Sequence, residues 1–428
     1  MVGVVVRDDR ARTPARPPLR VAFLVPHTGA GGAEMNLRTL LARLDRSAIS
    51  PVVLVAGDGP AVDLLAGAGA PIVRVRTPRF FSTSYRFGPR CGRFAGRAVF
   101  NPAAVLADCA LLAWAALAYA RALRRARARV VYTGSIFAHL LGLLAAPLAG
   151  ARLVWHVQDI VSPRLAGGAV LPVFTWLGAR RAEAVICPSE GVAAGLRVHW
   201  PPDASRRPRV VHNGIDTRDY APAPPHDRRT PRAELGLPDD AFVVAHIGRL
   251  APWKGQREFL EAARLVAHER QEARFVVVGD TVFGEAAYRD ELHALVERLG
   301  LREKVIFTGW RRDVPAVLAA TDALAHSSIL PEPFGLVIVE AMAMGRPVVA
   351  SRLGGATEIV REGQDGFLVD PRRPREMADA LLRLAADPHL RLSMGRSGRA
   401  RAVACFDAER FAAGIGAVLE TVAGGSGR

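Results

Sequence analysis

Cysteine is scarce in this sequence, and lysine is almost absent. Only four cysteines occur in 428 residues, and no two of them stand in a Cys-x-x-Cys spacing. Their scatter argues against a disulfide framework or a zinc site and is typical of a protein of the reducing cytosol. Lys254 and Lys304 are the only lysines, so arginine carries nearly all of the positive charge.

Long apolar segments are also few. Met1–Val6 is too short for the hydrophobic core of a secretory signal. Residues 130–151 have no formal charge, but their Gly, Ser, His and Pro indicate a strand, a turn and a helix. Residues 103–120 carry only Asp108 and precede an arginine-rich run. They predict a buried helix or, as the alternative, an amphipathic element on a membrane. We therefore expect a cytoplasmic protein without a transmembrane helix, either free or peripheral at the inner face of the plasma membrane.

The formal charge of +16 is unevenly distributed along the chain. The residues up to Asp216 hold 28 arginines and 12 acidic residues, whereas the remainder holds 29 basic and 29 acidic residues. A basic surface on the first half would attract anionic lipid, an acidic ligand or nucleic acid. A simple bias toward arginine accounts for the excess equally well. The Arg- and Pro-rich residues 1–19 predict a disordered basic arm.

Short apolar runs alternate with helical patterns in both halves, which predicts parallel sheets covered on both faces. The polar, Pro-rich residues 217–240 interrupt this pattern and predict a linker. The fold class is therefore α/β, with two doubly wound Rossmann-like domains at 20–216 and 241–405 that face each other across a cleft. Residues 406–428 predict a helix that packs back toward the first domain, followed by a tail. Ligands of such sheets bind at the carboxyl ends of the strands. The predicted strands are Val21–Pro26, Val52–Ala56, Ile72–Val75, Val130–Thr133, Leu153–Val157, Ala184–Pro188, Val210–His212, Phe242–Ile247, Arg274–Gly279, Val305–Thr308, Ala323–Ser327, Pro347–Ala350 and Gly366–Val369.

The segment from Pro331 to Ser351 carries the most specific pattern. Prolines on both sides of Glu332 predict a fixed loop, and the apolar run after Gly335 predicts a helix with Glu340 in its first two turns. A helix N-terminus offers free N–H groups to a diphosphate. The two carboxylates then flank one site, where they can accept hydrogen bonds from sugar and ribose hydroxyls.

This Glu-x7-Glu spacing with Phe-Gly between the acids resembles the signature of family 4 of the retaining glycosyltransferases, which have the GT-B fold. The resemblance implies that Glu332 contacts the donor sugar and that Glu340 binds the ribose of the nucleotide. It also implies that the backbone of Phe334, Gly335 and Leu336 meets the donor. A capped helix with two surface acids is the structural alternative.

Two cations follow the first strand of the second half, in the run Gly248 to Gly255. Arg249 and Lys254 stand in a turn that leads into a helix, where they can neutralise a departing diphosphate. The same spacing of Arg and Lys serves this purpose in the family. Gly248 and Gly279, each at a strand end, are expected to line the donor site.

On the first half, the loop Gly29-Ala30-Gly31-Gly32 resembles the glycine loop with which the family approaches the donor from across the cleft, through Gly31 and Gly32 here. His156 ends a strand at a position where many members carry a histidine near the transferred sugar, and Asp159 follows it. Asn213–Asp216 predicts a hinge. Ser189 predicts a helix N-cap.

The resemblance implies a retaining transfer of a hexose from a nucleotide-diphosphate sugar to a polysaccharide or lipid-linked glycan. No Asp-x-Asp pair occurs in the sequence, so we expect no metal, no other cofactor, and charge neutralisation by Arg249 and Lys254. A nucleotide-sugar epimerase of the same fold and a non-enzymatic polyanion-binding module are the alternatives. The sequence lacks the interleaved aromatics of a nucleic-acid binder. It does not disclose the sugar, the base, the acceptor or the oligomeric state.

Overall fold

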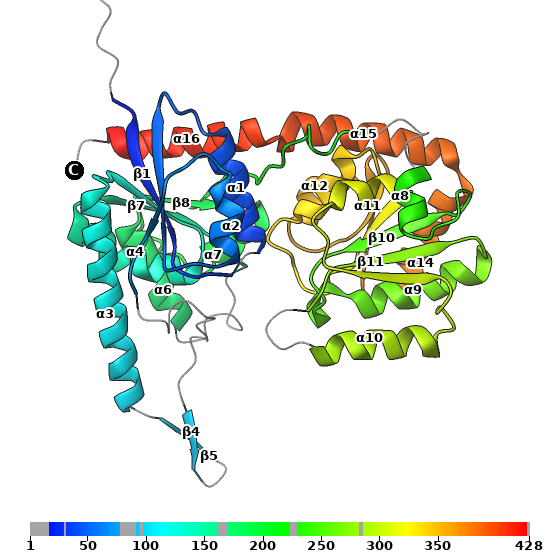
Figure 1. The fold of residues 1–428 in the computed structure, drawn as a ribbon, viewed down its shortest axis with the longest axis horizontal. Helices are drawn as coiled ribbons and strands as arrows, with labels where there is room; N and C mark the ends of the chain where they lie inside the picture. The colour runs from blue at the N-terminus through cyan, green and yellow to red at the C-terminus, as the bar shows by residue number, and fades with distance from the viewer. Residues whose placement is uncertain are drawn as a thin grey trace, which may run out of the picture.

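Two parallel sheets, one of seven strands and one of six, form the cores of the two halves of the molecule (Figure 1). The computed structural model describes residues 17–29, 31–77, 91–94, 97–100, 102–160, 170–222, 229–281 and 286–425. The predicted basic arm lies outside these residues up to position 16, as does Ala30 of the glycine loop. The two Rossmann-like sheets confirm the predicted α/β fold class.

The first sheet has the strand order β3-β2-β1-β6-β7-β8-β9. Its strands are apolar on both faces because helices cover both. One face packs against α3, α4, α6 and α7, and the other against α1, α2 and the last helix, α16. The strands are β1 (Leu19–Val25), β2 (Ile49–Val55), β3 (Ile72–Arg74), β6 (Val130–Thr133), β7 (Arg152–His156), β8 (Ala184–Cys187) and β9 (Arg209–Val210). The helices are α1 (Gly32–Arg43), α2 (Pro60–Ala66), α3 (Pro102–Arg125), α4 (Ile136–Ala149), α6 (Val170–Arg181) and α7 (Glu190–Arg197).

The second sheet has the order β12-β11-β10-β13-β14-β15. Its strands are β10 (Val243–Ile247), β11 (Arg274–Val278), β12 (Val305–Gly309), β13 (Ala323–His326), β14 (Val348–Ser351) and β15 (Gly366–Val369). The helices of this half are α8 (Arg229–Glu234), α9 (Gln256–Glu269), α10 (Ala286–Arg298), α11 (Val314–Ala320), α12 (Leu336–Ala343), α13 (Ala356–Ile359), α14 (Pro374–Ala386) and α15 (Pro388–Phe406). α8 lies inside the segment predicted as a linker, and its buried Arg232 pairs with Asp322 at 2.8 Å. The later part of that segment therefore packs on the second domain.

The chain passes between the two halves twice, and the two passages lie side by side. Ile215 pairs with Asp407 in a parallel bridge, and the Thr217 hydroxyl donates a hydrogen bond of 2.6 Å to the Asp407 carboxylate. Asp407 also caps α16 (Ala408–Gly424), which packs on α1, β6 and β7 of the first domain (Figure 1). The last helix thereby completes the core of the first domain.

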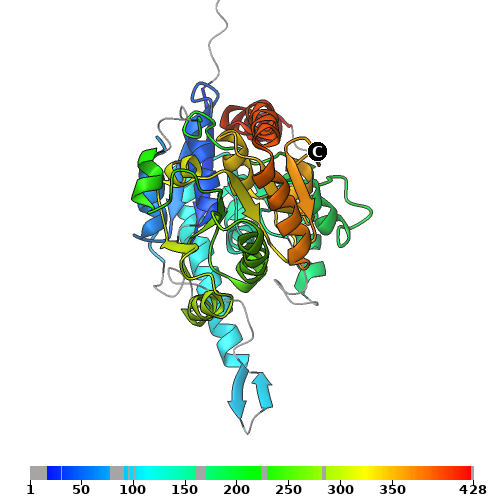
Figure 2. The same ribbon diagram turned by 90° about the vertical axis from the view of Figure 1, so that its right-hand side faces the viewer.

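A slender projection extends from the first domain. The N-terminal end of α3 and the hairpin of β4 (Cys91–Phe94) and β5 (Arg97–Phe100) reach beyond the rest of the molecule in both ribbon views (Figures 1 and 2). α3 is buried along one side only, where Ala116, Tyr119 and Leu123 enter the core. The prediction of a buried helix at 103–120 therefore holds for one side of this helix. None of the helices in the described parts of the chain combines the length and the apolar composition that a membrane span requires.

Candidate donor site between the two domains

The loop after β10 is held against the end of β13. A 3₁₀ turn, Pro252–Lys254, leads to Gly255, whose φ of 73° is left-handed. A Cβ atom on Gly255 would lie 1.9 Å from the carbonyl oxygen of Ser327, so only glycine fits there. The tight turn fixes Lys254 at the carboxyl edge of the second sheet.

Glu332 lies at the centre of a buried polar cluster at this edge. Its carboxylate accepts a hydrogen bond from Lys254 Nζ on one oxygen. On the other oxygen it accepts from His326 Nε2 at 2.5 Å and from Ser328 Oγ at 2.8 Å. Gly354 backs the Glu332 loop at a φ of 63°, and a Cβ atom there would lie 2.3 Å from the Glu332 carbonyl oxygen. The side chain of Glu332 therefore has one fixed position.

The environment of Glu332 favours its charged form. Burial alone would raise the pKa of this carboxyl, but the charges of Lys254 and His326 and their hydrogen bonds outweigh burial. They hold the pKa of Glu332 well below its usual range. Glu332 is thus a fixed anion whose orientation is set by three partners.

The environment of Glu340 favours the neutral form of its carboxyl instead, although Glu340 lies on the helix that directly follows the Glu332 loop. It is partly buried on α12, whose N-cap is Gly335. Burial raises the pKa of Glu340 to about 7, against a hydrogen bond from the Tyr220 hydroxyl that lowers it. Tyr220 belongs to the first passage between the domains. The second acid of the motif therefore exchanges a proton near neutral pH.

The remaining donor-side predictions map to the same edge. The Gly248 N–H donates to the Val278 carbonyl at 2.9 Å, which places the ends of β10 and β11, and with them Gly248 and Gly279, in contact. Arg249 follows directly, is partly exposed, and pairs with no carboxylate of the described residues. Phe334 is buried against Phe406, so only its backbone is available to a ligand.

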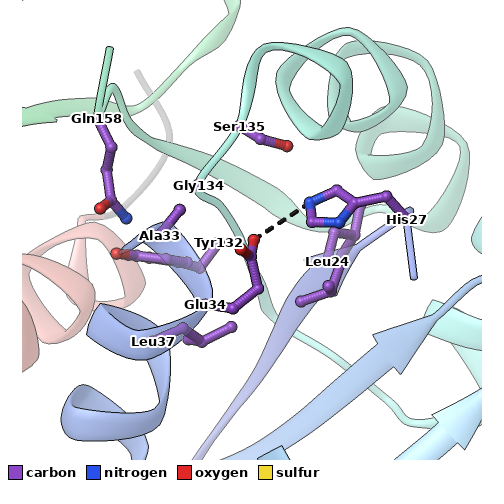
Figure 3. A pocket seen from close by; sticks show the side chains of 10 residues that line it. Leu24, His27, Ala33, Glu34, Leu37, Tyr132, Gly134, Ser135 and Gln158 are labelled. Atoms are coloured by element: carbon purple, nitrogen blue, oxygen red, sulfur yellow. Dashed lines mark ion pairs between the residues drawn. The ribbon is translucent and has the colours of Figure 1, made fainter. Parts of the chain in front are cut away.

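A small pocket lies at the carboxyl edge of the first sheet (Figure 3). The Gly31 N–H donates to the Glu34 carboxylate at 2.8 Å and caps α1, and Glu34 in turn pairs with His27 at 3.2 Å. Gly31 and Gly32 are exposed at the start of this helix. The pocket exposes more apolar than polar surface and contains the pair of His27 and Glu34. Its lining residues are Leu24, Val25, His27, Ala33, Glu34, Leu37, Tyr132, Gly134, Ser135 and Gln158.

His156 does not line this pocket. Its side chain is fully buried, its Nδ1 shares a hydrogen bond with the Tyr132 hydroxyl, and its ring lies 6.2 Å from that of Phe411 on α16. Burial lowers the pKa of His156 to about 3, so the ring is neutral. Strand alternation thus turns the His156 side chain into the core and away from the pocket, and its position beside a transferred sugar stays a prediction. Gln158, two residues further on, reaches the pocket instead, and Asp159 is exposed.

The two sheet edges touch through the start of α7. Ser189 caps α7 by accepting from the Val192 N–H at 3.1 Å, as predicted, and its hydroxyl donates to the Pro333 carbonyl at 2.6 Å. The Glu358 carboxylate of the second domain accepts from the Glu190 and Gly191 N–H groups at 2.8 and 2.9 Å. The carboxyl ends of both sheets therefore meet around the loop that carries Glu332.

Several residues of this site were not among those predicted from the sequence. His326 and Ser328 stand at the end of a predicted strand, next to the Glu332 motif, so the rule that ligands bind at strand ends could have found them. Tyr220 lies in a segment without periodicity, and no local pattern connects it to Glu340. The pocket residues come from separate elements and converge only in the folded chain.

Both halves of the chain match models of known protein families. Residues 30–219 match the model described as Glycosyltransferase Family 4, and residues 227–401 match the model described as Glycosyl transferases group 1. Together the two matches cover most of the chain, but not β1 or α16.

Curated relatives and solved structures agree with these matches. The D-inositol 3-phosphate glycosyltransferase of Corynebacterium glutamicum is 38% identical over 205 residues, which are 47% of this chain and 48% of the relative. The alpha-D-kanosaminyltransferase of Streptomyces kanamyceticus is 33% identical over 238 residues, 53% of this chain and 58% of the relative. The chain thus spans about half the length of the curated relatives it matches. The crystal structure of HepE from Anabaena in complex with UDP and glucose is 30% identical, with a TM-score of 0.78 over 94% of this chain and 100% of that one.

Proposed function

This chain belongs to the family 4 glycosyltransferases, with the GT-B fold, and we propose that it is a retaining, metal-independent hexosyltransferase that draws its sugar from a nucleotide-diphosphate donor. The observation that carries this proposal is the cluster at the carboxyl edge of the second sheet. There Glu332 is held as an anion by Lys254, His326 and Ser328, and Arg249 belongs to the same loop as Lys254. A fixed anion can orient sugar hydroxyls, and the two cations can receive the charge of a leaving diphosphate.

The proposed donor spans this edge. Its sugar contacts Glu332, its diphosphate lies beside Arg249 and Lys254 and the N-terminus of α12, and its ribose hydroxyls donate to Glu340. Solved complexes of HepE with UDP and with UDP-glucose support a uridine diphosphate sugar as the donor. Gly31 and Gly32 approach the donor from the first domain.

The proposed acceptor is a hydroxyl of a polysaccharide or of a lipid-linked glycan. It enters from the first domain, whose pocket offers neutral hydrogen-bonding groups such as Gln158 and Ser135. The bond between the anomeric carbon and the phosphate oxygen breaks as the acceptor oxygen bonds to the same face of that carbon. The acceptor proton passes to the departing phosphate, so His156 is not needed as a base.

Replacement of Glu332 tests the site directly. In Glu332→Gln the side chain keeps its size but loses its charge, and Lys254 loses its counter-ion. We expect transfer from a radiolabelled nucleotide sugar to fall by about 100-fold or more. The exposed Glu303 of the same domain provides the control, and Glu303→Gln should transfer like the wild type. Equal activity of the two variants would contradict the assignment of Glu332 to the donor site.

Chelation tests the proposed role of the cations. If Arg249 and Lys254 neutralise the leaving group, the initial rate should be unchanged after dialysis against EDTA. A rate that falls in EDTA and returns with Mn²⁺ or Mg²⁺ contradicts metal-independent transfer.

A further inference from the structure

The outer surface of one helical layer of the first domain is unusually apolar. Thirteen large hydrophobic side chains are exposed among the described residues, and seven of them lie on only three helices, α3, α4 and α6. These helices cover the same face of the first sheet. The seven residues, hereafter the apolar face, are Leu106, Trp114, Leu117, Leu144, Leu148, Val173 and Trp176.

The same three helices carry positive charge with little to balance it. Their sequences contain five arginines and one acidic residue, Asp108. The arginines stand in the last turns of α3 and α6. Arg121, Arg125 and Arg181 are exposed and form no ion pair within the described parts of the chain. Apolar side chains and free cations therefore share one surface.

The rest of the molecule does not repeat this combination. On the opposite side of the first sheet, α16 has no exposed large hydrophobic residue within its described span. The second half of the chain has no net charge, and its described exposed large hydrophobic residues are few: Trp310 follows β12, and Leu392 and Val403 lie on α15. The apolar face is thus a local feature and not a general property of the surface.

We propose that the apolar face docks on a membrane surface that contains anionic lipid. Trp and Leu side chains would enter the boundary between headgroups and acyl chains, while the arginines at the ends of α3 and α6 would meet lipid phosphates. The partner is an anionic bilayer because an apolar layer flanked by unpaired cations matches both parts of such a surface. The docking is peripheral, since no described helix can span a bilayer.

The shape of the first domain suits this docking. α3 continues beyond the sheet as the projection seen in both ribbon views, and Leu106 on that extension is 70% exposed (Figures 1 and 2). The arginines lie at the other end of the helix, about 22 Å away at 1.5 Å per residue. None of the seven residues of the apolar face lines the pocket of the first domain. The inference does not depend on the proposed sugar transfer.

Vesicle flotation of the full chain tests the proposal. The protein should float with vesicles of equal parts phosphatidylglycerol and phosphatidylcholine, remain unbound with phosphatidylcholine alone, and dissociate as salt rises. Trp114→Glu combined with Trp176→Glu should abolish binding, whereas Trp310→Glu, an exposed tryptophan of the second domain, should bind like the wild type. Failure to bind anionic vesicles, or equal loss in Trp310→Glu, overturns the proposal.

Charge reversal provides a second, independent variant. Arg121→Glu with Arg125→Glu should reduce the partition constant by at least about fivefold per residue, which corresponds to about 1 kcal/mol per charge near an anionic surface. Arg264→Glu with Arg298→Glu, on exposed positions of the second domain, is the control. Unchanged donor hydrolysis would show that the variants are folded. If sedimentation velocity instead shows a dimer that the tryptophan variants dissolve, the apolar face is a self-interface and membrane docking is refuted.

Discussion

The two sheet edges that meet at the candidate site are built from different chemistry. On the second domain, Glu332 and Lys254 are buried charges that hold each other in place. On the first domain, the pocket is lined mainly by neutral groups beside the pair of His27 and Glu34, and His156 is turned into the core. An anionic donor requires fixed charges at set positions, whereas a hydroxyl-bearing acceptor requires shape and neutral hydrogen bonds. The first kind of site is encoded in short motifs and the second kind is not.

The largest effect is expected when a charge is removed from the second domain. Lys254→Ala should lower kcat/KM for the donor by about 100- to 1,000-fold, because the leaving diphosphate loses a cation and Glu332 loses its strongest partner. Lys304 is the other lysine of the chain and lies away from the site, where it bonds to Gln271 at 2.5 Å. Lys304→Ala is therefore a matched control with near wild-type kinetics, measured as UDP release. A similar loss of kcat/KM in both variants would contradict the special role of the charges at the edge of the second sheet.

Nucleotide affinity is expected to depend on pH through the Glu340 carboxyl, by about tenfold per pH unit. Its pKa of about 7 means that the carboxyl is neutral below that pH, when it cannot accept from both ribose hydroxyls. Nucleotide affinity, measured by calorimetry, should therefore weaken about tenfold for each unit below pH 7. Glu340→Gln should show weak binding without this dependence.

The raised pKa of Glu340 also predicts how stability depends on pH. A higher pH favours nucleotide binding but lowers the stability of the unliganded protein. Because ionisation of Glu340 is disfavoured in the folded, unliganded protein, it costs stability once the pH exceeds the ordinary value of 4.5. The free energy of unfolding should decrease from about pH 4.5 to 7 relative to Glu340→Gln. No difference between the two proteins over this range would place Glu340 in solvent.

The smallest effects are expected on the first domain. Gln158→Ala should raise the acceptor KM by a few-fold and leave donor hydrolysis unchanged, because one neutral hydrogen bond is lost. His156→Phe should leave transfer within about twofold of the wild type, although the Tyr132 hydroxyl loses its partner and stability falls by about 1–3 kcal/mol. Complete loss of transfer in a folded His156→Phe variant would show that His156 takes part in the reaction.

The fold and the donor motif could be predicted from the sequence because both depend on local patterns. Buried parallel strands are continuous apolar runs, so β1, β6, β10 and β13 stand out against helical patterns. Glu332, Glu340 and Lys254 lie within short segments whose turns are dictated by proline and glycine. The positions of these residues follow from local backbone geometry.

The rest of the site depends on tertiary packing. The burial of His156 could not be predicted, because its strand alternates between two buried faces. Both faces are apolar, so the pattern does not tell which side faces a ligand. Tyr220 contacts Glu340 only because the chain between the domains runs past α12. His326 required knowledge that β13 ends beside the loop of Glu332.

The return of α16 to the first sheet has a consequence for synthesis on the ribosome. Phe411, Ile415 and Leu419 on α16 fill the core beside α1, β6 and β7, although they are translated after the whole second domain. The first domain therefore emerges early with part of one side of its sheet uncovered, and this part is covered only at the end of translation. A nascent chain stalled after the second domain should present this uncovered face to chaperones, and chimeras that exchange domains must carry the last helix along with the first half.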